Sequence, residues 1–405
     1  MVKKKINNQH NRINIFALAA TGLGISGGDR IFIEFARRWN KEMPVEIYVS
    51  EEGYQMCLRQ NLKESKDLRF TIYDLRTWNK LGFIANYVVR ILTGIKIGLT
   101  LKLENSQNSI IYSASEFWMD SLPAFLLKLR FPKIKWAAAW YQTAPNPFKG
   151  FSEGEAGTRD RLRALIYWLI QLPIKPLISG FADYVLVNND GEKKQFPNLD
   201  KRGRALVVLG AVDLEGIKSW KLKFRNLPKI YEAVFQGRFH PQKGVMELID
   251  IWKHVAAKKP DAKLVMIGDG PLMENVKLQI TNYKLNKNII LKGYMFDGEE
   301  KFKIFAQSRI VVHPAFFDSG GMASAEAMAF GLPCVGFNLG AYKYYYPKGM
   351  EKVREGDIKA FADKVAEFLQ DNNLYRKVAN KALHLIGDKW SWEYRARQIL
   401  NAVLE

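Results

Sequence analysis

Four charged residues in the second half of the chain are spaced around glycine-rich turns. Arg238 and Lys243 lie between a predicted strand and a predicted helix, where a guanidinium fork and an ammonium could hold a diphosphate. Asp318 precedes another predicted helix and Glu326 lies inside it, so the two carboxylates are about 12 Å apart along the helix axis. One acid could then bind sugar hydroxyls while the other binds a ribose. Together the four residues fit a nucleoside diphosphate linked to a sugar.

The glycine-rich turns favour the same kind of ligand. Gly320 and Gly321 let a ligand approach the backbone closely, and the free N–H groups of the following helix favour phosphate. Ligands of open α/β sheets lie beyond the carboxyl ends of the strands, where these turns are expected. The binding candidates of this kind are Gly268, Gly270, Ser319, Gly320, Gly321 and Met322.

Each feature also has a plainer interpretation. Asp318 could simply cap its helix, and Glu326 could be an ordinary surface residue. The basic turn 238–243 could be solvated, and the turn 268–270 could bind nothing. His313, at the end of a further predicted strand, is interpreted as a core histidine. The hypothesis of a binding site therefore depends on the features occurring together.

Composition bounds the class of protein. The chain has 405 residues, enough for two domains, and 61 Lys and Arg against 41 Asp and Glu give a net charge of +20. Such a charge favours anionic partners such as nucleic acid, acidic lipid headgroups or phosphorylated substrates, although it can also serve solubility alone. The only cysteines, Cys57 and Cys334, imply no disulfide framework and fit a reducing cytosol. Neither a signal peptide at residues 1–12 nor an uncharged membrane-spanning stretch is predicted.

The organisation of the chain predicts an α/β fold. Short β-rich runs alternate with longer helical patterns twice over, which is typical of parallel sheets covered by helices on both faces. We predict two doubly wound, Rossmann-like domains facing one cleft, the first over residues 1–217 and the second over residues 218–388. The stretch 218–229, rich in Lys, Arg and Pro, is interpreted as a linker. In the second domain, a helix at 245–257 is expected to bury a stripe with a 3.6-residue period.

The order of these motifs resembles a known family. The motifs are Gly237-Arg238-Phe239, Lys243-Gly244, Ile267-Gly268-Asp269-Gly270-Pro271, and Asp318 followed by Glu326-Ala327-Met328-Ala329, Gly331 and Pro333. In this order they resemble the group 1 (family 4) retaining glycosyltransferases, which have the GT-B architecture. The start Trp390-Ser391-Trp392-Glu393 resembles that of the family's last helix. The resemblance therefore implies that residues 389–405 form a helix packing back on the first domain.

The resemblance also implies roles for the site residues. Arg238 and Lys243 would bind the diphosphate of a UDP- or GDP-sugar. Glu326 would bind its ribose, and Asp318 the transferred hexose. These four residues would support catalysis without a cofactor or a metal ion, and no His, Asp or Cys cluster has metal-ligand spacing. The family usually has Glu followed by Pro-Phe-Gly where this chain has Asp318 and then Ser-Gly-Gly, a difference that bears on the choice of donor sugar.

The first domain leaves a second class of function open. Gly22, Gly24 and Gly27 follow a predicted strand, and Glu51 ends the next one, which together fit a dinucleotide-binding fingerprint. An NAD(P)-dependent oxidoreductase is therefore an alternative. It would leave the motifs of the second domain unexplained, so Gly27 and Gly28 are interpreted instead as a loop beside the donor phosphates.

Acceptor-side residues are expected in the stretch 140–145, where relatives often carry a histidine and this chain has none. Tyr141 and Gln142 are the candidates. An apolar stripe between residues 87 and 99 and the segment 161–175, both with interspersed Arg and Lys, suggest a surface that lies on anionic lipid, although both could equally be core helices. The interpretation is a cytoplasmic enzyme at the inner face of the plasma membrane, with a glycan or lipid-linked acceptor and no nucleic acid. A non-catalytic binder on a degenerate transferase fold remains a further alternative.

Overall fold

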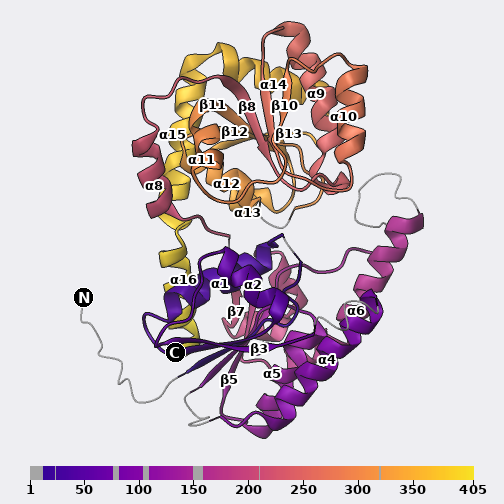
Figure 1. The fold of residues 1–405 in the computed structure, drawn as a ribbon, viewed down its shortest axis with the longest axis vertical. Helices are drawn as coiled ribbons and strands as arrows, with labels where there is room; N and C mark the ends of the chain where they lie inside the picture. The colour runs from indigo at the N-terminus through magenta and orange to yellow at the C-terminus, as the bar shows by residue number, and fades with distance from the viewer. Residues whose placement is uncertain are drawn as a thin grey trace. The chain divides into compact units, whose positions relative to one another are not determined.

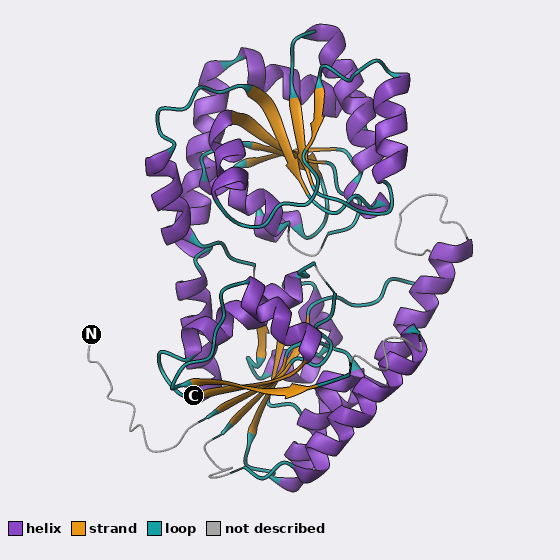
Figure 2. Cartoon of the chain, viewed as in Figure 1, coloured by secondary structure: helices purple, strands orange, loops and turns teal. Residues whose placement is uncertain are grey.

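The computed structural model describes residues 12–22, 24–75, 82–103, 109–148, 158–208, 210–318 and 321–405. These residues form two compact units (Figures 1 and 2). The first contains residues up to 148, residues 162–208 and residues 393–405, and the second consists chiefly of residues 209–392. Each unit is built around one parallel sheet with helices on both faces, as the alternation of strand and helix patterns predicts.

The first unit contains a seven-stranded sheet with the order β3-β2-β1-β4-β5-β6-β7, in which all neighbours are parallel. Its strands are β1 (Ile13–Phe16), β2 (Val45–Ser50), β3 (Leu68–Tyr73), β4 (Ile110–Ser113), β5 (Lys135–Trp140), β6 (Tyr184–Val187) and β7 (Ala205–Val207). The central strands β1 and β4 are buried along their whole length, because helices exclude water from both faces.

The helices of the first unit are α1 (Gly27–Trp39), α2 (Glu51–Arg59), α4 (Phe83–Thr100), α5 (Trp118–Arg130), α6 (Thr158–Phe181), α7 (Pro197–Lys201) and α16 (Trp392–Leu404), with a 3-10 turn η2 (Glu192–Gln195). Helix α1 begins with a capping box, in which Ser26 Oγ accepts from Asp29 N at 3.2 Å and Asp29 Oδ2 accepts from Ser26 N at 3.0 Å. Helices α4 and α5 approach closely at Gly98, where a Cβ would lie 2.8 Å from the Cβ of Leu126.

The second unit contains a six-stranded parallel sheet with the order β10-β9-β8-β11-β12-β13. Its strands are β8 (Tyr231–Gln236), β9 (Leu264–Ile267), β10 (Ile289–Leu291), β11 (Ser308–His313), β12 (Cys334–Phe337) and β13 (Met350–Val353). Its helices are α8 (Leu214–Lys223), η3 (Pro241–Lys243), α9 (Val245–Lys258), α10 (Met273–Asn282), α11 (Glu299–Gln307), α12 (Met322–Ala329), α13 (Tyr342–Tyr345), α14 (Ile358–Gln370) and α15 (Asn372–Lys389). Separate apolar clusters cover the two faces of this sheet.

The predicted fold class is confirmed, since both sheets are parallel and doubly wound. The returning C-terminal helix is also confirmed, because α16 packs on α1 of the first unit (Figure 1). Trp39 Nε1 donates to the carbonyl oxygen of Ala396 at 2.9 Å, and Arg38 pairs with Glu393 at 2.6 Å.

The predicted linker is wrong over its first part. Helix α8 runs to Lys223, because Asp213 caps it through the N–H of Gly216 and the side chain of Ile217 is buried. Of the basic residues that suggested a linker, Lys218 and Lys223 are exposed on this helix, whereas Lys221 is half-buried and donates to the carbonyl oxygen of Ala329 at 3.1 Å.

Candidate functional site

The sequence-predicted charges meet at the carboxyl ends of β8 and β11. These strands are neighbours in the second sheet, and the order of the sheet reverses between them. Such a reversal is where open α/β sheets bind ligands, because the loops that follow the two strands diverge there. The turn after β8 carries Arg238 and Lys243, and the segment after β11 carries Asp318.

Backbone contacts join these two segments. The N–H groups of Phe316 and Phe317 both donate to the carbonyl oxygen of Gln242, at 2.9 and 3.2 Å. Gly244 has φ +62°, and a Cβ at this position would lie 1.9 Å from the carbonyl oxygen of Pro314. Glycine is therefore required here both for its conformation and for the close approach of the two segments.

Asp318 is the centre of a buried charged cluster. Its Oδ2 is 2.8 Å from Lys243 Nζ and 2.8 Å from His313 Nε2, while its Oδ1 accepts from Gly321 N at 2.9 Å. The side chain of Asp318 is 8% exposed and that of Lys243 is 23% exposed. Burial opposes ionisation of the carboxyl, but the Lys243 ammonium and the His313 hydrogen bond outweigh it and hold the pKa of Asp318 well below its usual value. The cluster thus presents a fixed carboxylate beside a partly exposed ammonium.

Glu326 lies in a second buried cluster on α12. Its Oε2 is 2.6 Å from Lys301 Nζ and accepts from Gln236 Nε2 at 3.3 Å. Lys301 Nζ also binds Asp297 Oδ1 at 2.6 Å, and the Lys301 side chain is 1% exposed. Glu326 is therefore not the surface residue of the plainer interpretation. Lys301 was missed from the sequence, although a lysine within the apolar face of a predicted helix, next to Phe302, was a signal that could have found it.

Two polar groups near these clusters are available to a ligand. The side chain of Arg238 is exposed and has no ion-pair partner among the residues that the structure describes. Gln236 ends β8, and its Oε1 is buried without a hydrogen-bond partner in the described part of the chain. A free guanidinium suits a diphosphate, and an unpaired amide oxygen suits a hydroxyl or N–H donor.

The glycine turn after β9 packs against the turn after β8. A Cβ on Gly268 would lie 1.8 Å from the carbonyl oxygen of Gly237, and one on Gly270 would lie 2.5 Å from that of Phe239. These glycines therefore hold the two turns together; ligand contact by them stays a prediction. Met322 opens α12 and packs against Gly210, whose added Cβ would lie 2.2 Å from Met322 Cγ.

The predicted Ser319 and Gly320 lie outside the residues that the structure describes. Gly321, which follows them, is the N-cap residue of α12 and belongs to the Asp318 cluster through its N–H group.

In the first unit, the acceptor-side candidates lie just after β5. Tyr141 is 6% exposed, and its hydroxyl is 2.6 Å from that of Tyr112. Gly28, in the first turn of α1, lies against the Tyr141 ring, since a Cβ there would be 3.3 Å from Tyr141 Cδ2. Gly27 is the first residue of α1. The structure thus brings Gly28 and Tyr141 together within this unit.

The second acceptor-side candidate, Gln142, is held through its backbone. Its carbonyl oxygen accepts from Gln171 Nε2 at 2.6 Å and from Tyr167 Oη at 3.1 Å, both on α6. Tyr167 Oη also donates to Glu116 Oε1 at 2.5 Å. Burial raises the pKa of the Glu116 carboxyl, which follows β4 at the point where the order of the first sheet reverses. Glu116 could not be predicted from the sequence, because its hydrogen-bond partners, Tyr167 and the backbone of Tyr141, come from two distant segments.

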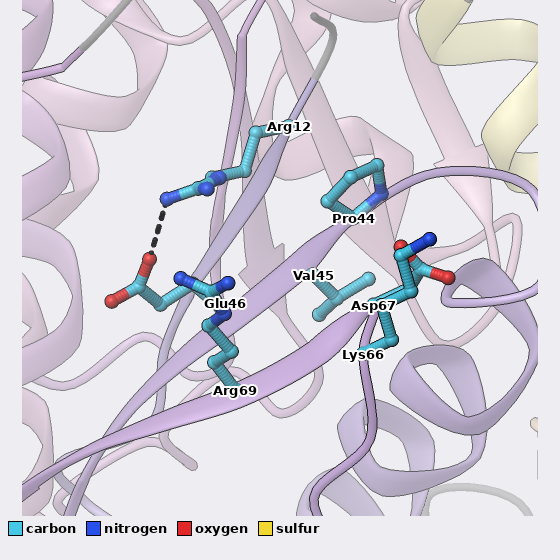
Figure 3. A pocket seen from close by; sticks show the side chains of 7 residues that line it. All are labelled: Arg12, Pro44, Val45, Glu46, Lys66, Asp67 and Arg69. Carbon is cyan, nitrogen blue, oxygen red and sulfur yellow. Dashed lines mark hydrogen bonds and ion pairs between the residues drawn. The ribbon is translucent and has the colours of Figure 1, made fainter.

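A shallow hollow of about 220 Å³ lies at the opposite edge of the first sheet (Figure 3). Its lining includes Arg12, Glu46, Lys66 and Arg69, which lie at the amino ends of β1, β2 and β3 or just before them. Arg12 Nη1 donates to Glu46 Oε2 at 2.8 Å within it (Figure 3). Ligands of this class of sheet bind at the carboxyl edge, so this hollow is separate from the candidate site.

Comparison with known sequences finds one family and several relatives. The family described as "Glycosyl transferases group 1" matches residues 218–384. The chain is 24% identical over 191 residues to the poly(glycerol-phosphate) alpha-glucosyltransferase of Bacillus subtilis, covering 44% of this chain and 28% of that protein. It is 32% identical over 143 residues to the UDP-Gal:alpha-D-GlcNAc-diphosphoundecaprenol alpha-1,3-galactosyltransferase of Escherichia coli, covering 33% of this chain and 36% of that protein. The alignments span less than half the length of these curated relatives.

Comparison of folds extends over both units. The crystal structure of the Anabaena protein HepE in complex with UDP and glucose matches with a TM-score of 0.68 at 14% sequence identity. The match covers 97% of this chain and 99% of that one, so the two chains share one fold from end to end.

Proposed function

We propose that this chain transfers a hexose from a nucleotide diphosphate sugar, because residues 218–384 belong to the group 1 glycosyltransferases and the chain has the GT-B fold. The donor is a UDP- or GDP-sugar, and the anomeric configuration is retained. The acceptor is a glycan or a lipid-linked glycan at the cytoplasmic face of a membrane. Names of relatives support a hexose, since they describe alpha-glucosyl and alpha-1,3-galactosyl transfer.

The observation that carries the proposal is the pair of charged clusters beside the reversal point of the second sheet. Arg238 is exposed without an ion-pair partner in the described residues, and Lys243 lies beside Asp318. These cations would neutralise the diphosphate as it leaves, which stabilises the charge that develops in the transition state. Glu326, fixed by Lys301, would accept hydrogen bonds from the ribose. UDP in the HepE structure supports a uridine donor.

Acceptors named for two relatives support the acceptor class. The Escherichia coli protein acts on a diphosphoundecaprenol-linked sugar, and the Bacillus subtilis protein on poly(glycerol-phosphate). Both acceptors are anionic, and the net charge of +20 on this chain favours the binding of anionic acceptors. A lipid-linked acceptor would place the enzyme at the membrane surface.

Calorimetric titration with UDP, GDP, ADP and NAD tests the donor site. We expect UDP or GDP to bind the wild type and to bind Arg238→Ala at least tenfold more weakly, because a charge-assisted contact contributes about 1.5–3 kcal/mol. Arg225→Ala is the control, since Arg225 is also an exposed arginine of the second unit. Binding of NAD that Arg238→Ala leaves unchanged would contradict the proposal and favour an oxidoreductase using Gly22–Gly27.

A further inference from the structure

Two helices of the first unit leave large apolar side chains in contact with solvent. The segment Arg161–Phe181 of α6 has a mean hydropathy of 1.3, as long and apolar as a membrane-crossing helix, yet only 22% of its most apolar stretch is buried. Its exposed apolar residues are Leu162, Leu165, Ile166, Trp168, Leu169, Leu172 and Phe181. On α4 the exposed apolar residues are Ile84, Val88, Leu92 and Leu99, which recur at helical spacing along one stripe. Large contiguous apolar patches are rare on soluble monomers and mark interaction sites.

The exposed residues belong to one group of adjacent helices. Helix α4 packs on α5 through Gly94 and Gly98, where an added Cβ would clash with α5. Helix α5 contacts α6 through the rings of Phe125 and Phe181, whose centroids are 4.9 Å apart, and Trp118 Nε1 donates to the carbonyl oxygen of Ile170 at 2.7 Å. Figure 1 shows the three helices along the same side of the first sheet. We call the exposed apolar residues of α4 and α6 named above the α4/α6 face.

The charges around the α4/α6 face are mostly positive. Lys96 of α4 and Arg161 and Arg163 of α6 are exposed. Helix α4 contains no acid, and the only acids of α5 and α6 are Asp120, which is buried, and Asp160. A second copy of the chain would bring like charges together in a symmetric contact, whereas an anionic lipid surface complements both the charge and the apolar area.

The inward side of α6 is polar and hydrogen-bonded, which argues against a membrane-spanning role. Gln171 is 4% exposed; its Oε1 accepts from Ala144 N at 2.7 Å and its Nε2 donates to the carbonyl oxygen of Gln142. Tyr167, one turn earlier, donates to Glu116. A helix with one polar, docked side and one apolar, exposed side suits the plane of a membrane interface.

We propose that the α4/α6 face binds the surface of an anionic bilayer, with α6 lying in the interface plane. The exposed leucines, isoleucines and Trp168 enter the headgroup region while Lys96, Arg161 and Arg163 contact lipid phosphates. This docking gives α6 a second role, an inference that rests on the proposed function. It holds the segment 142–144, through the Gln142 carbonyl and the Ala144 N–H, close to the membrane from which a lipid-linked acceptor would come.

Vesicle co-sedimentation tests the proposal. We expect the wild type to bind phosphatidylcholine vesicles containing phosphatidylglycerol, to bind pure phosphatidylcholine vesicles much less, and to be released by high salt and by alkaline carbonate. Leu165→Glu with Leu169→Glu should weaken binding more than tenfold, since both residues would enter the lipid. Leu278→Glu is the matched control, because Leu278 is 62% exposed on α10 of the second unit. Lys96→Gln and Arg163→Gln should each weaken binding roughly fivefold.

UDP titration of the same variants separates this proposal from the donor site. The double glutamate variant should bind UDP or GDP as the wild type does, since the substitutions lie on exposed positions of the first unit. Vesicle binding that the glutamate variant keeps would overturn the proposal. So would a wild-type dimer that the variant dissociates in sedimentation velocity, which would assign the face to a second copy. Retention by carbonate-washed membranes would overturn the in-plane orientation, because a spanning helix resists extraction.

Discussion

At the scale of single residues, Asp318 carries a charge that its neighbours keep in place. Asp318→Asn removes that charge and leaves Lys243 and His313 facing an amide. We expect the variant to be less stable at pH 7 by about 1–3 kcal/mol in urea unfolding, because Lys243 is partly exposed and water replaces part of the lost interaction. Donor turnover should fall at least a hundredfold, which is about 2.7 kcal/mol of transition-state stabilisation.

The contribution of Asp318 to the stability of the protein falls as the pH is lowered. Its pKa in the folded protein lies below the unfolded value of about 3.9, so its contribution to stability is complete above that value and is lost as the pH falls through the folded pKa. Unfolding followed between about pH 5 and pH 2 should therefore show a shallower loss of stability in Asp318→Asn than in the wild type. If the free energy of unfolding fell equally steeply with pH in both proteins, the lowered pKa of Asp318 would be contradicted.

Lys301 is a buried cation whose role is best measured by removing it. Lys301→Met removes the buried ammonium that pairs with Glu326 and Asp297, and we expect it to lower the free energy of unfolding by about 3 kcal/mol. Adding Glu326→Gln should recover part of the loss, since the uncompensated carboxylate is then removed. The control Lys277→Met breaks an exposed pair with Glu274 and should change stability by less than about 0.5 kcal/mol. If the two lysine variants lowered the stability equally, burial would not make the ion pairs of Lys301 more important for stability than an exposed pair.

At the scale of elements, the turn after β8 and the segment after β11 touch at Gly244, and we expect them to bind the donor as one edge. Gly244→Ala would place a Cβ 1.9 Å from the Pro314 carbonyl oxygen at a φ of +62°. We expect a loss of about 2 kcal/mol or more in stability and weaker UDP binding, because Lys243 and Asp318 would separate. Gly340→Ala should be tolerated, since an added Cβ there meets nothing within 4 Å. Normal UDP affinity in Gly244→Ala would show that the two segments bind independently.

The elements also show what a sequence can and cannot predict. Arg238, Lys243 and Asp318 could be placed at one sheet edge, because strand–helix alternation alone brings every post-strand turn to that edge. Lys301 and Asp297 form a local pair four residues apart, but the pair of Lys301 with Glu326 could not be predicted, since only tertiary packing brings α12 to α11.

Arg90 lies in the stripe between residues 87 and 99, whose Arg and Lys side chains are predicted to form a basic surface, and for Arg90 this prediction is wrong. It is 2% exposed, because its guanidinium donates to the Leu18 carbonyl oxygen and pairs with Glu52, both at 2.6 Å. Hydropathy patterns locate the faces of a helix but do not tell which charged residue finds a buried partner. Apolar side chains of α4 and α6 are exposed, and their contact with anionic lipid stays a prediction.

At the scale of the whole molecule, helix α16 makes the first unit depend on a segment that follows the second unit in the sequence. Helix α16 buries Ile399, Leu400 and Val403, and the carbonyl oxygens of Val403 and Leu404 accept from Lys135 Nζ at 2.9 and 2.8 Å. The first unit is therefore complete only after the second has been synthesised, since residues 209–392 lie between its segments. The stability of the first unit therefore depends on α16, which follows the second unit in the sequence.

Leu400→Asp tests that coupling. A buried carboxylate at a 4% exposed position should lower the stability of the first unit by about 3 kcal/mol or more, because an unpaired charge replaces an apolar contact. Asn401→Asp, at the neighbouring exposed position of α16, should leave it unchanged. In thermal unfolding, UDP should still raise the transition of the second unit in Leu400→Asp, since ligand binding stabilises only the unit that binds it. If both transitions fell together and UDP stabilised neither, the two units would unfold as one cooperative body, and the donor site would depend on α16 as much as the first sheet does.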